Sequence, residues 1–476
     1  MHILQEVKMD FLLKTVSLVN SYLSDYVLTF LLVGAGVYFS IRTKFVQIRC
    51  FGEGVRNAFG KFTLHGRGGK NGFSPFQALS TAVAAQVGTG NIVGASGAIL
   101  TGGPGSIFWM WIIAFFGMST IYAEAVLAQK SRQVDADGTI HGGPVYYIKT
   151  AFTGFSGKFL AVFFAVAIMI SLGFMGCMVQ ANSIGETCST AFGFPSWIAG
   201  LVIAVLAGAV FIGGVSRLAG VTEKIVPVMA LIYLAGGLFV LLSRASYLPD
   251  TFMLIFKYAL APESIIGGTF GHALKTAVSQ GVKRGLFSNE AGMGSTPHAH
   301  AIAKVSSPHV QGTVAMIGVF IDTAVVLTMT AFIVISALYT GDGPLAGVSG
   351  SSYSEVLAAS GLTSTNLVQS AVASVSSTMF GNVFVAVCLL FFAFSTILSW
   401  NYFGRINCIY LFGKKSVPVY SALAVLCIFL GTLMKSDLVW ALQDMFNQLM
   451  VFPNIIALFA LSGTIAASAV PPETGK

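Results

Sequence analysis

Long apolar stretches separated by short polar segments make up most of the chain. A helix needs about 20 mostly apolar residues to cross the hydrocarbon core of a bilayer, so each stretch of that length predicts one transmembrane helix. Several of the stretches nevertheless carry glycines and polar residues near their centres. We predict eleven spans, near residues 18–40, 74–100, 105–130, 157–186, 196–214, 220–243, 265–300, 309–339, 378–403, 417–434 and 446–468.

Two of these spans are interrupted at membrane depth. The span 74–100 contains VGTGN at 87–91, and the span 265–300 contains GLFSNEAGMGS at 285–295. A helix is broken in hydrocarbon only where protein, water or a ligand takes the freed backbone groups, because each unsatisfied group costs several kcal/mol. The two broken spans lie five spans apart, and each is the first span of a set of five. This pattern is typical of inverted-repeat secondary transporters. Close packing through small residues is the alternative explanation of the glycines.

The composition supports the membrane assignment. Of the 476 residues, 55% are hydrophobic and 9% are charged, compared with about 25% charged in soluble domains. The net charge of +8 lies in short loops between spans, which favours a lipid bilayer over nucleic acid as the partner. The first apolar stretch runs on as a full span, so no removable signal peptide is expected. The six cysteines have no CxxC spacing and are expected to be buried thiols rather than disulfides or metal ligands.

The distribution of basic residues predicts the orientation. With eleven spans, most Lys and Arg residues fall in loops on one side, which the positive-inside rule assigns to the cytoplasm. We therefore expect an inner-membrane protein with its N-terminus outside and its C-terminus inside. The weakly apolar span 265–300 is kept, because without it Arg405, Lys414 and Lys415 would lie outside. The predicted divisions are an N-terminal helix with a basic amphipathic cytoplasmic linker (1–70), two five-helix repeats (71–243 and 244–470) and a cytoplasmic tail (471–476).

Four motifs resemble one known family. They are STAVAAQVGTGNIVG (80–94), GGPGSIFWMWIIAFFGMSTIYAEAVLAQKSR (102–132), GGPVYYI (142–148) and GVKRGLFSNEAGMGSTPHAHA (281–301). The chain resembles the alanine/glycine:cation symporters, also called sodium:alanine symporters, from about residue 50 to 465. The resemblance implies a LeuT-like all-α fold with one additional N-terminal helix. It also implies sodium-coupled uptake of a small neutral amino acid such as alanine or glycine, with sodium as the co-transported ion and no cofactor.

The first break supplies both kinds of binding group. Its freed N–H groups lie at the positive end of a half-helix dipole and suit a substrate carboxylate. Its freed carbonyls suit a sodium ion, and in the LeuT-like arrangement hydroxyls of the eighth core helix join them. Ser and Thr hydroxyls that bond to their own helix are the alternative. The predicted sodium ligands are Ala84, Val87, Ser395 and Thr396. The predicted substrate-binding residues are Gly88, Thr89, Gly90, Asn91, Gln180, Phe287, Ser288 and Trp400. The two aromatic residues are expected to limit side-chain size, with packing or interface contacts as the alternative, and a second cation is the alternative ligand of Asn91.

Three acids lie within predicted spans and are candidates for gating or structural charge. We expect Glu124 to anchor or gate the inner end, near the basic residues that follow it. Glu290 is expected to pair with Arg284. For Asp322 two interpretations stay open, a salt bridge to Lys283 or Arg284 and a role in cation coupling.

Two further features concern specificity and metal binding. Gln86 directly precedes the first break and is a candidate for tuning substrate preference. His298 and His300 are two residues apart with no third ligand nearby, so a metal site is not predicted there.

Other classes of protein fit the sequence less well. An ion channel is usually built from identical repeats around a pore, whereas this chain has two unlike halves. No GxSxG, HExxH or Walker A motif indicates an enzyme. The main alternative is a LeuT-fold symporter for another small solute, or one coupled to protons.

Overall fold

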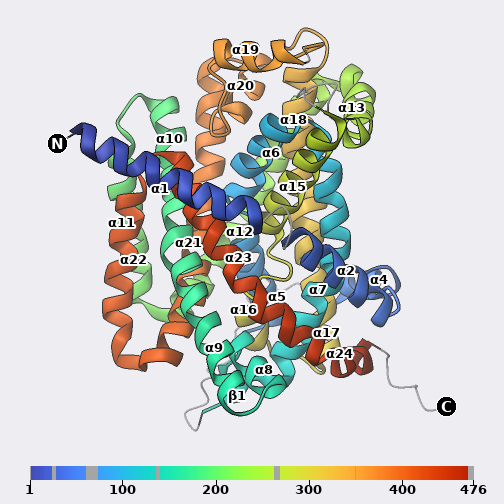
Figure 1. Ribbon diagram of the computed structural model, residues 1–476, viewed down its shortest axis with the longest axis vertical. Coiled ribbons are helices and arrows are strands. Elements are labelled where there is room, and N and C mark those ends of the chain that lie inside the picture. The colour runs from blue at the N-terminus through green and yellow to red at the C-terminus, as the bar shows by residue number, and fades with distance from the viewer. Residues whose placement is uncertain are drawn as a thin grey trace.

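The computed structural model describes residues 2–23, 28–60, 73–135, 140–261, 269–348 and 350–469. Within them the chain is a helical bundle with a single two-stranded antiparallel hairpin, in which Gln133 pairs with His141. Figure 1 shows α19 (Ser351–Ser360) and α20 (Leu367–Ser374) at one end of the bundle. The hairpin β1 (Gln133–Val134) and β2 (Ile140–His141) lies at the other end, beside α8 (Pro144–Ala151).

The helices of the first half are α1 (His2–Tyr22), α2 (Thr29–Arg42), α3 (Val46–Arg49), α4 (Phe51–Phe59), α5 (Pro75–Gln86), the π-helix η2 (Gly90–Gly94), α6 (Ala95–Gly102), α7 (Ser106–Ser131), α9 (Gly154–Ile168), the π-helix η3 (Met169–Gly176), α10 (Cys177–Phe192), α11 (Ser196–Ile212) and α12 (Gly214–Ser243). Those of the second half are η4 (Ala245–Tyr247), α13 (Leu248–Leu260), α15 (Phe270–Asn289), α16 (Pro297–Ala301), α17 (Pro308–Val319), the π-helix η5 (Phe320–Leu327), α18 (Thr328–Val334), the π-helix η6 (Ile335–Tyr339), α21 (Thr378–Phe412), η7 (Lys414–Ser416), α22 (Val417–Gly431), α23 (Ser436–Ala460) and α24 (Ser462–Ala469).

The first break separates α5 from η2 and α6. A capping box between Ser74 and Gln77, with Pro75 at the first helical position, starts α5. The helix ends at Gln86, and Val87 has the non-helical ψ of 89°. The axes on the two sides of the break differ by 45°. The unwound segment is therefore short, and the chain is helical again from η2.

The second break starts later than the sequence predicts. The predicted interruption begins at residue 285, but α15 continues to Asn289. Glu290 then takes the left-handed φ of 59°, and Gly292 and Gly294 follow with φ of 91° and 79°. Glycine adopts such angles without steric cost, so these two glycines define the turn that ends at Pro297.

The two broken helices cross the centre of the bundle in opposite directions. Figure 1 places α6 and α15 above α5 and α16, so the chain ascends through the first break and descends through the second. Where α5 begins and α16 ends, Phe73 donates its N–H to the Ile302 carbonyl at 3.1 Å and accepts from the Lys304 N–H at 3.0 Å. These bonds form a parallel bridge at Phe73, whereas the broken helices themselves run in opposite directions, as an inverted repeat would produce.

The number of spans differs from the prediction. Among the described residues, six helices are long and apolar enough to cross a membrane, or up to eight if each bent pair is one span. Two more apolar helices, α2 and α11, are shorter, with 14 and 17 residues. The count of eleven is not confirmed, because α15 carries charged residues such as Lys283 and Arg284. The predicted single span 18–40 is instead the end of α1 followed by α2.

The lipid-facing character of the bundle appears in its outer helices. Only 22% of the most apolar stretch of α12, and the same share of α22, is buried inside the protein. Large apolar side chains such as Ile212, Leu231 and Val419 are exposed. Apolar faces of this extent indicate contact with hydrocarbon rather than water.

Candidate functional site

The carbonyl end of α5 meets α21 at a cluster of oxygen atoms. The Thr396 hydroxyl lies 2.8 Å from the carbonyl oxygen of Ala84 and 3.4 Å from that of Val87. It lies 3.0 Å from the carbonyl oxygen of Phe392, to which the Ser395 hydroxyl also donates at 2.9 Å. Three carbonyls thus surround the Thr396 hydroxyl, and the Ser395 hydroxyl shares the Phe392 carbonyl with it. Hard cations take oxygen ligands of this kind.

One member of this cluster was missed from the sequence. Phe392 contributes only its backbone carbonyl, so its side-chain type gives no hint. The sequence does indicate this carbonyl in one way. Phe392 lies three residues before Ser395 and four before Thr396, and Ser and Thr hydroxyls in a helix often donate to the carbonyl three or four residues earlier. Thr396 combines that bond with contacts to α5, whereas Ser395 also lies 3.5 Å from the sulfur of Met229. The structure thus places Thr396 closer to the first break than Ser395.

Gly88 allows α21 to approach the break. A Cβ atom at Gly88 would overlap the Thr396 hydroxyl oxygen and lie 3.1 Å from Oε1 of Gln180. At Gly90 a Cβ atom would lie 3.0 Å from both the Phe287 ring and the Ser288 Cα atom. These glycines are required by close packing around the break, in addition to backbone freedom.

Side chains take the freed amides of the break. The Gly88 N–H donates to Oδ1 of Asn91 at 2.9 Å, and the Thr89 N–H donates to Oε1 of Gln180 at 3.1 Å. The Nε2 group of Gln180 and the hydroxyl of Thr89 are buried without any hydrogen-bond partner among the described residues. Buried polar groups are normally paired, so these two groups fit a polar ligand at the break.

Asp322 joins the first break to α15. Its fully buried carboxylate accepts from Nδ2 of Asn91 at 2.6 Å, from the Ser288 hydroxyl at 2.9 Å and from the Thr323 hydroxyl at 2.8 Å. No Lys, Arg or His within the described ranges forms an ion pair with it. The predicted salt bridge to Lys283 or Arg284 is therefore wrong.

Both of those basic residues bind another acid. Lys283 lies 2.6 Å and Arg284 3.1 Å from the carboxylate of Asp444 on α23. The sequence prediction failed because Asp444 is far away along the chain. The pairing leaves Asp322 with neutral hydrogen-bond donors only.

Glu124 stabilises the second break rather than the end of its own helix. Its buried carboxylate accepts from the N–H groups of Gly292 at 3.2 Å and Gly294 at 2.8 Å, and from Nδ2 of Asn454 at 2.6 Å. Its partners lie on the second break and on α23 rather than among the basic residues that follow it on α7, and a role in gating the inner end stays a prediction. Backbone amides freed by the turn supply the donors that a buried carboxylate needs.

Glu290 has partners different from the one predicted. Its carboxylate accepts from the Ser295 hydroxyl at 2.5 Å and from the Trp400 indole N–H, while Arg284 binds Asp444. Trp400 therefore has a polar role in addition to its bulk.

The variant Trp400→Phe should separate these two roles. It keeps an aromatic ring but removes the N–H donor, and leaving a buried polar group without its partner costs about 1–3 kcal/mol. We expect a lower Tm for the purified protein. Trp197→Phe is the matched control, because Trp197 is 45% exposed. Equal Tm values for the two variants would rule out a structural role for this bond.

Three aromatic rings and a cavity lie above the first break. Phe287 packs edge-on against Trp400, with centroids 5.6 Å apart, and against Trp440 at 4.7 Å. The Arg284 guanidinium lies 4.6 Å above the Trp440 ring. Trp440, which the sequence did not single out, also lines a cavity of about 580 Å³ together with Asp444. Trp440 is thus the ring that joins this aromatic cluster to the cavity.

Gln86 and the two histidines lie beside the breaks. Gln86 is buried and donates from Nε2 to the carbonyl of Asn289 at 2.8 Å, which connects the two breaks directly. His298 and His300 are buried, with ring nitrogens 2.7 Å from the Ser295 carbonyl and 2.8 Å from Nε2 of Gln311. These contacts give the histidines a structural role.

The fold matches that of a solved transporter. The crystal structure of MhsT in complex with L-phenylalanine superposes with a TM-score of 0.57 at 14% sequence identity, covering 84% of this chain and 100% of that one. The LeuT-like fold predicted from the motifs is therefore confirmed. Paired broken helices at corresponding positions of two halves are typical of secondary transporters.

Sequence comparisons then specify the family. A family model described as the sodium:alanine symporter family matches residues 9–470. The sodium/alanine symporter AgcS of Methanococcus maripaludis is 39% identical over 461 residues, covering 96% of each chain. The probable sodium/glutamine symporter GlnT of Bacillus subtilis is 38% identical over 452 residues, covering 94% of this chain and 88% of the relative. The chain belongs to the sodium:alanine symporter family.

Proposed function

We propose that this transporter couples sodium entry to the uptake of a small neutral amino acid, alanine or glycine, across the cytoplasmic membrane. The observation that supports this most strongly is the position of the Thr396 hydroxyl between the carbonyls of Ala84 and Val87. In the proposed sodium-bound state the hydroxyls of Ser395 and Thr396 turn their lone pairs toward the ion. The carbonyls of Ala84, Val87 and Phe392 complete the oxygen shell.

The substrate carboxylate is proposed to bind at the start of η2. There it accepts from the Thr89 and Gly90 N–H groups, at the positive end of the half-helix. In the structure the Thr89 N–H donates to Oε1 of Gln180. When substrate binds, this N–H would donate to the substrate carboxylate instead, and the unpaired Nε2 group of Gln180 would donate to the same carboxylate. Gly88 and Asn91 shape the same turn. The positive end and the unpaired donor both favour an anion.

The substrate side chain is proposed to lie against Phe287 and Trp400, with Ser288 beside them. Their rings pack edge-on against each other with centroids 5.6 Å apart, so both would bound the space for the substrate side chain. We propose alanine or glycine rather than glutamine, the substrate in the name of the Bacillus relative, because two large rings at the substrate side chain would favour a small one. Gln86, beside Asn289, is proposed to adjust this preference.

Asp322 is proposed to be the second coupling group. A buried carboxylate with neutral donors only is costly in hydrocarbon, and a cation or a proton at this position would neutralise it. Proton coupling is the alternative mechanism, and this acid is the residue through which it would act. Glu124 and Glu290 are proposed to hold the second break in shape.

The proposed topology follows the charge distribution. The N-terminus lies outside and the C-terminus inside, and residues 71–243 and 244–470 form the two repeats. The basic linker beyond residue 60 and the tail 471–476 lie outside the described residues. The loop 340–377 contains no Lys or Arg, which supports its placement on the outer side.

Competition by alaninamide tests the proposed carboxylate site. Charge-assisted hydrogen bonds are worth about 1.5–3 kcal/mol each, so losing two should weaken binding by roughly a hundredfold or more. We expect alaninamide to fail as a competitor of sodium-dependent alanine uptake at concentrations where unlabelled alanine competes fully. Equal competition by both compounds would mean that the carboxylate is not recognised at η2.

A further inference from the structure

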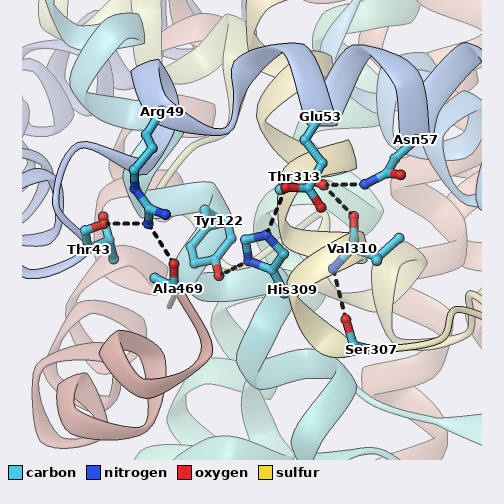
Figure 2. A network of polar contacts seen from close by, with 10 residues as sticks. All are labelled: Thr43, Arg49, Glu53, Asn57, Tyr122, Ser307, His309, Val310, Thr313 and Ala469. Atoms are coloured by element: carbon cyan, nitrogen blue, oxygen red, sulfur yellow. Dashed lines mark hydrogen bonds and ion pairs between the residues drawn. The ribbon is translucent and has the colours of Figure 1, made fainter. Parts of the chain in front are cut away.

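A second group of ligand-type side chains lies away from the broken helices. It consists of Cys50, which precedes α4, Glu53 in the first turn of α4, and His309 near the start of α17. One ligand atom from each residue, the thiol sulfur, a carboxylate oxygen and a ring nitrogen, lies within 4.8 Å of the other two. Figure 2 shows Glu53 and His309 pointing toward each other between α4 and α17. The transport site uses none of these residues.

Close packing of α4 on α17 brings the three residues together. Asn57 donates to the Thr313 hydroxyl at 3.1 Å, one turn further along both helices. A Cβ atom at Gly54 would lie 2.7 Å from the Thr313 carbonyl oxygen, so only glycine permits this approach. Cys50 and Glu53 are three residues apart and therefore lie on the same side of the first turn.

The orientation of His309 suits metal coordination. Its Nδ1 atom lies 2.8 Å from the Tyr122 hydroxyl, and its Nε2 atom lies 3.3 Å from the Glu53 carboxylate. Metal-binding histidines characteristically use one ring nitrogen for the metal and hydrogen-bond through the other. Tyr122 is the residue that would fix the ring here.

The charge of the cluster also favours a cation. Among the described residues, His309 is the only hydrogen-bond partner of Glu53. Arg49, which directly precedes Cys50, donates to the carbonyls of Thr43 and Ala469, and Figure 2 shows it directed away from Glu53. Among the described residues no Arg or Lys forms an ion pair with Glu53, so its carboxylate is available to a divalent ion.

We propose that Cys50, Glu53 and His309 bind a zinc-type divalent transition-metal ion, with water in the fourth position. Zinc takes mixed sulfur, nitrogen and oxygen ligands in tetrahedral geometry, and bonds of about 2.0–2.1 Å give neighbouring oxygen and nitrogen ligands a separation of about 3.3 Å. The Glu53 to His309 distance already has this value. The bound ion joins α4 to α17.

This site has a mechanical consequence that rests on the proposed transport function. The helix α17 leads directly into η5, which carries Asp322. An ion that holds α4 against α17 restrains the helix next to the proposed coupling acid. Occupancy of the site should therefore slow transport, whereas metal binding itself does not depend on the transported substrate.

Cobalt absorption of the full-length, reduced protein without a histidine tag tests the site directly. A cobalt–thiolate bond gives a near-ultraviolet charge-transfer band, and we expect one equivalent of Co²⁺ to produce it and Zn²⁺ to displace it. Cys50→Ser should abolish the band. Cys408→Ser is the matched control. Cys408 lies on α21, where its thiol contacts the Ser416 hydroxyl, so this variant should keep the band.

A second set of variants keeps the test decisive if Cys50→Ser does not fold. Tyr122→Phe leaves all three ligands in place but removes the partner of His309, and loss of such a partner typically weakens metal binding 10- to 100-fold. Glu53→Gln should weaken it at least as much. No thiolate band in the wild-type protein, or a band that persists in Cys50→Ser, would overturn the proposal. The sodium dependence of uptake tests the proposed transport function separately, because its result does not depend on whether the cobalt band appears.

Discussion

Replacing Thr396 with Val should raise the sodium concentration for half-maximal uptake by about ten- to a hundredfold. Valine keeps the branched shape and removes the hydroxyl that lies between the Ala84 and Val87 carbonyls. An interaction with a charged partner is worth about 1.5–3 kcal/mol, and each 1.4 kcal/mol is tenfold in affinity. Uptake of alanine over a series of sodium concentrations in proteoliposomes measures the change.

Thr187→Val is the matched control for this variant. The Thr187 hydroxyl is also buried in a helix, but it bonds only to carbonyls of its own helix, those of Ser183 and Ile184. Its replacement should leave the sodium dependence unchanged. If Thr396→Val and Thr187→Val give the same sodium curve as the wild-type protein, the oxygen cluster is not a sodium site.

Replacing Gly88 with Ala should abolish sodium-driven uptake. The added methyl group would occupy the space of the Thr396 hydroxyl and crowd the Gln180 side-chain oxygen. Overpacking of a buried position typically costs 1–3 kcal/mol, and here the strain falls on proposed ligands of both sodium and substrate. We expect at least a hundredfold loss of uptake rate, measured at equal protein density in proteoliposomes.

Gly34→Ala provides the comparison for this substitution. Gly34 lies in α2, and a Cβ atom there has no other heavy atom within 4 Å. The control should fold and transport normally, which separates the effect of position from that of the residue change. Normal uptake by Gly88→Ala would show that close contact between the break and α21 is not needed for transport.

The interrupted helices were predictable from the sequence because the cost of a broken helix in lipid is local. Glycines and Asn91 within an apolar stretch are visible without knowledge of any partner. The carbonyls of Ala84 and Val87 were predictable for the same reason, since they are the last groups of a half-helix. The motifs of the family then pointed to the hydroxyls of α21.

The partners of the buried acids were not predictable in this way. Glu124 was expected to act at the inner end, near the basic residues that follow it, but the sequence did not indicate its partners, which are two glycine amides and Asn454. Local spacing reports neighbours on one helix, whereas burial pairs side chains from helices far apart in the chain. The same limit hid the pairing of Lys283 and Arg284 with Asp444.

The length of the helices was also only partly predictable. Hydropathy marks where apolar residues begin and end, but α21 extends nine residues beyond the predicted end at 403, to Phe412. The second break began five residues later than predicted, because the left-handed turn forms at Glu290 and its glycines rather than at Gly285. Backbone geometry, rather than composition, sets these boundaries.

The most direct test of the account is alanine accumulation by purified protein in liposomes under a defined ion gradient. An inward sodium gradient should drive alanine above its equilibrium level. An inward proton gradient of the same size, with potassium replacing sodium on both sides, should not. Accumulation driven by protons alone, or alanine uptake that is unchanged when sodium is removed, would contradict sodium coupling at the first break.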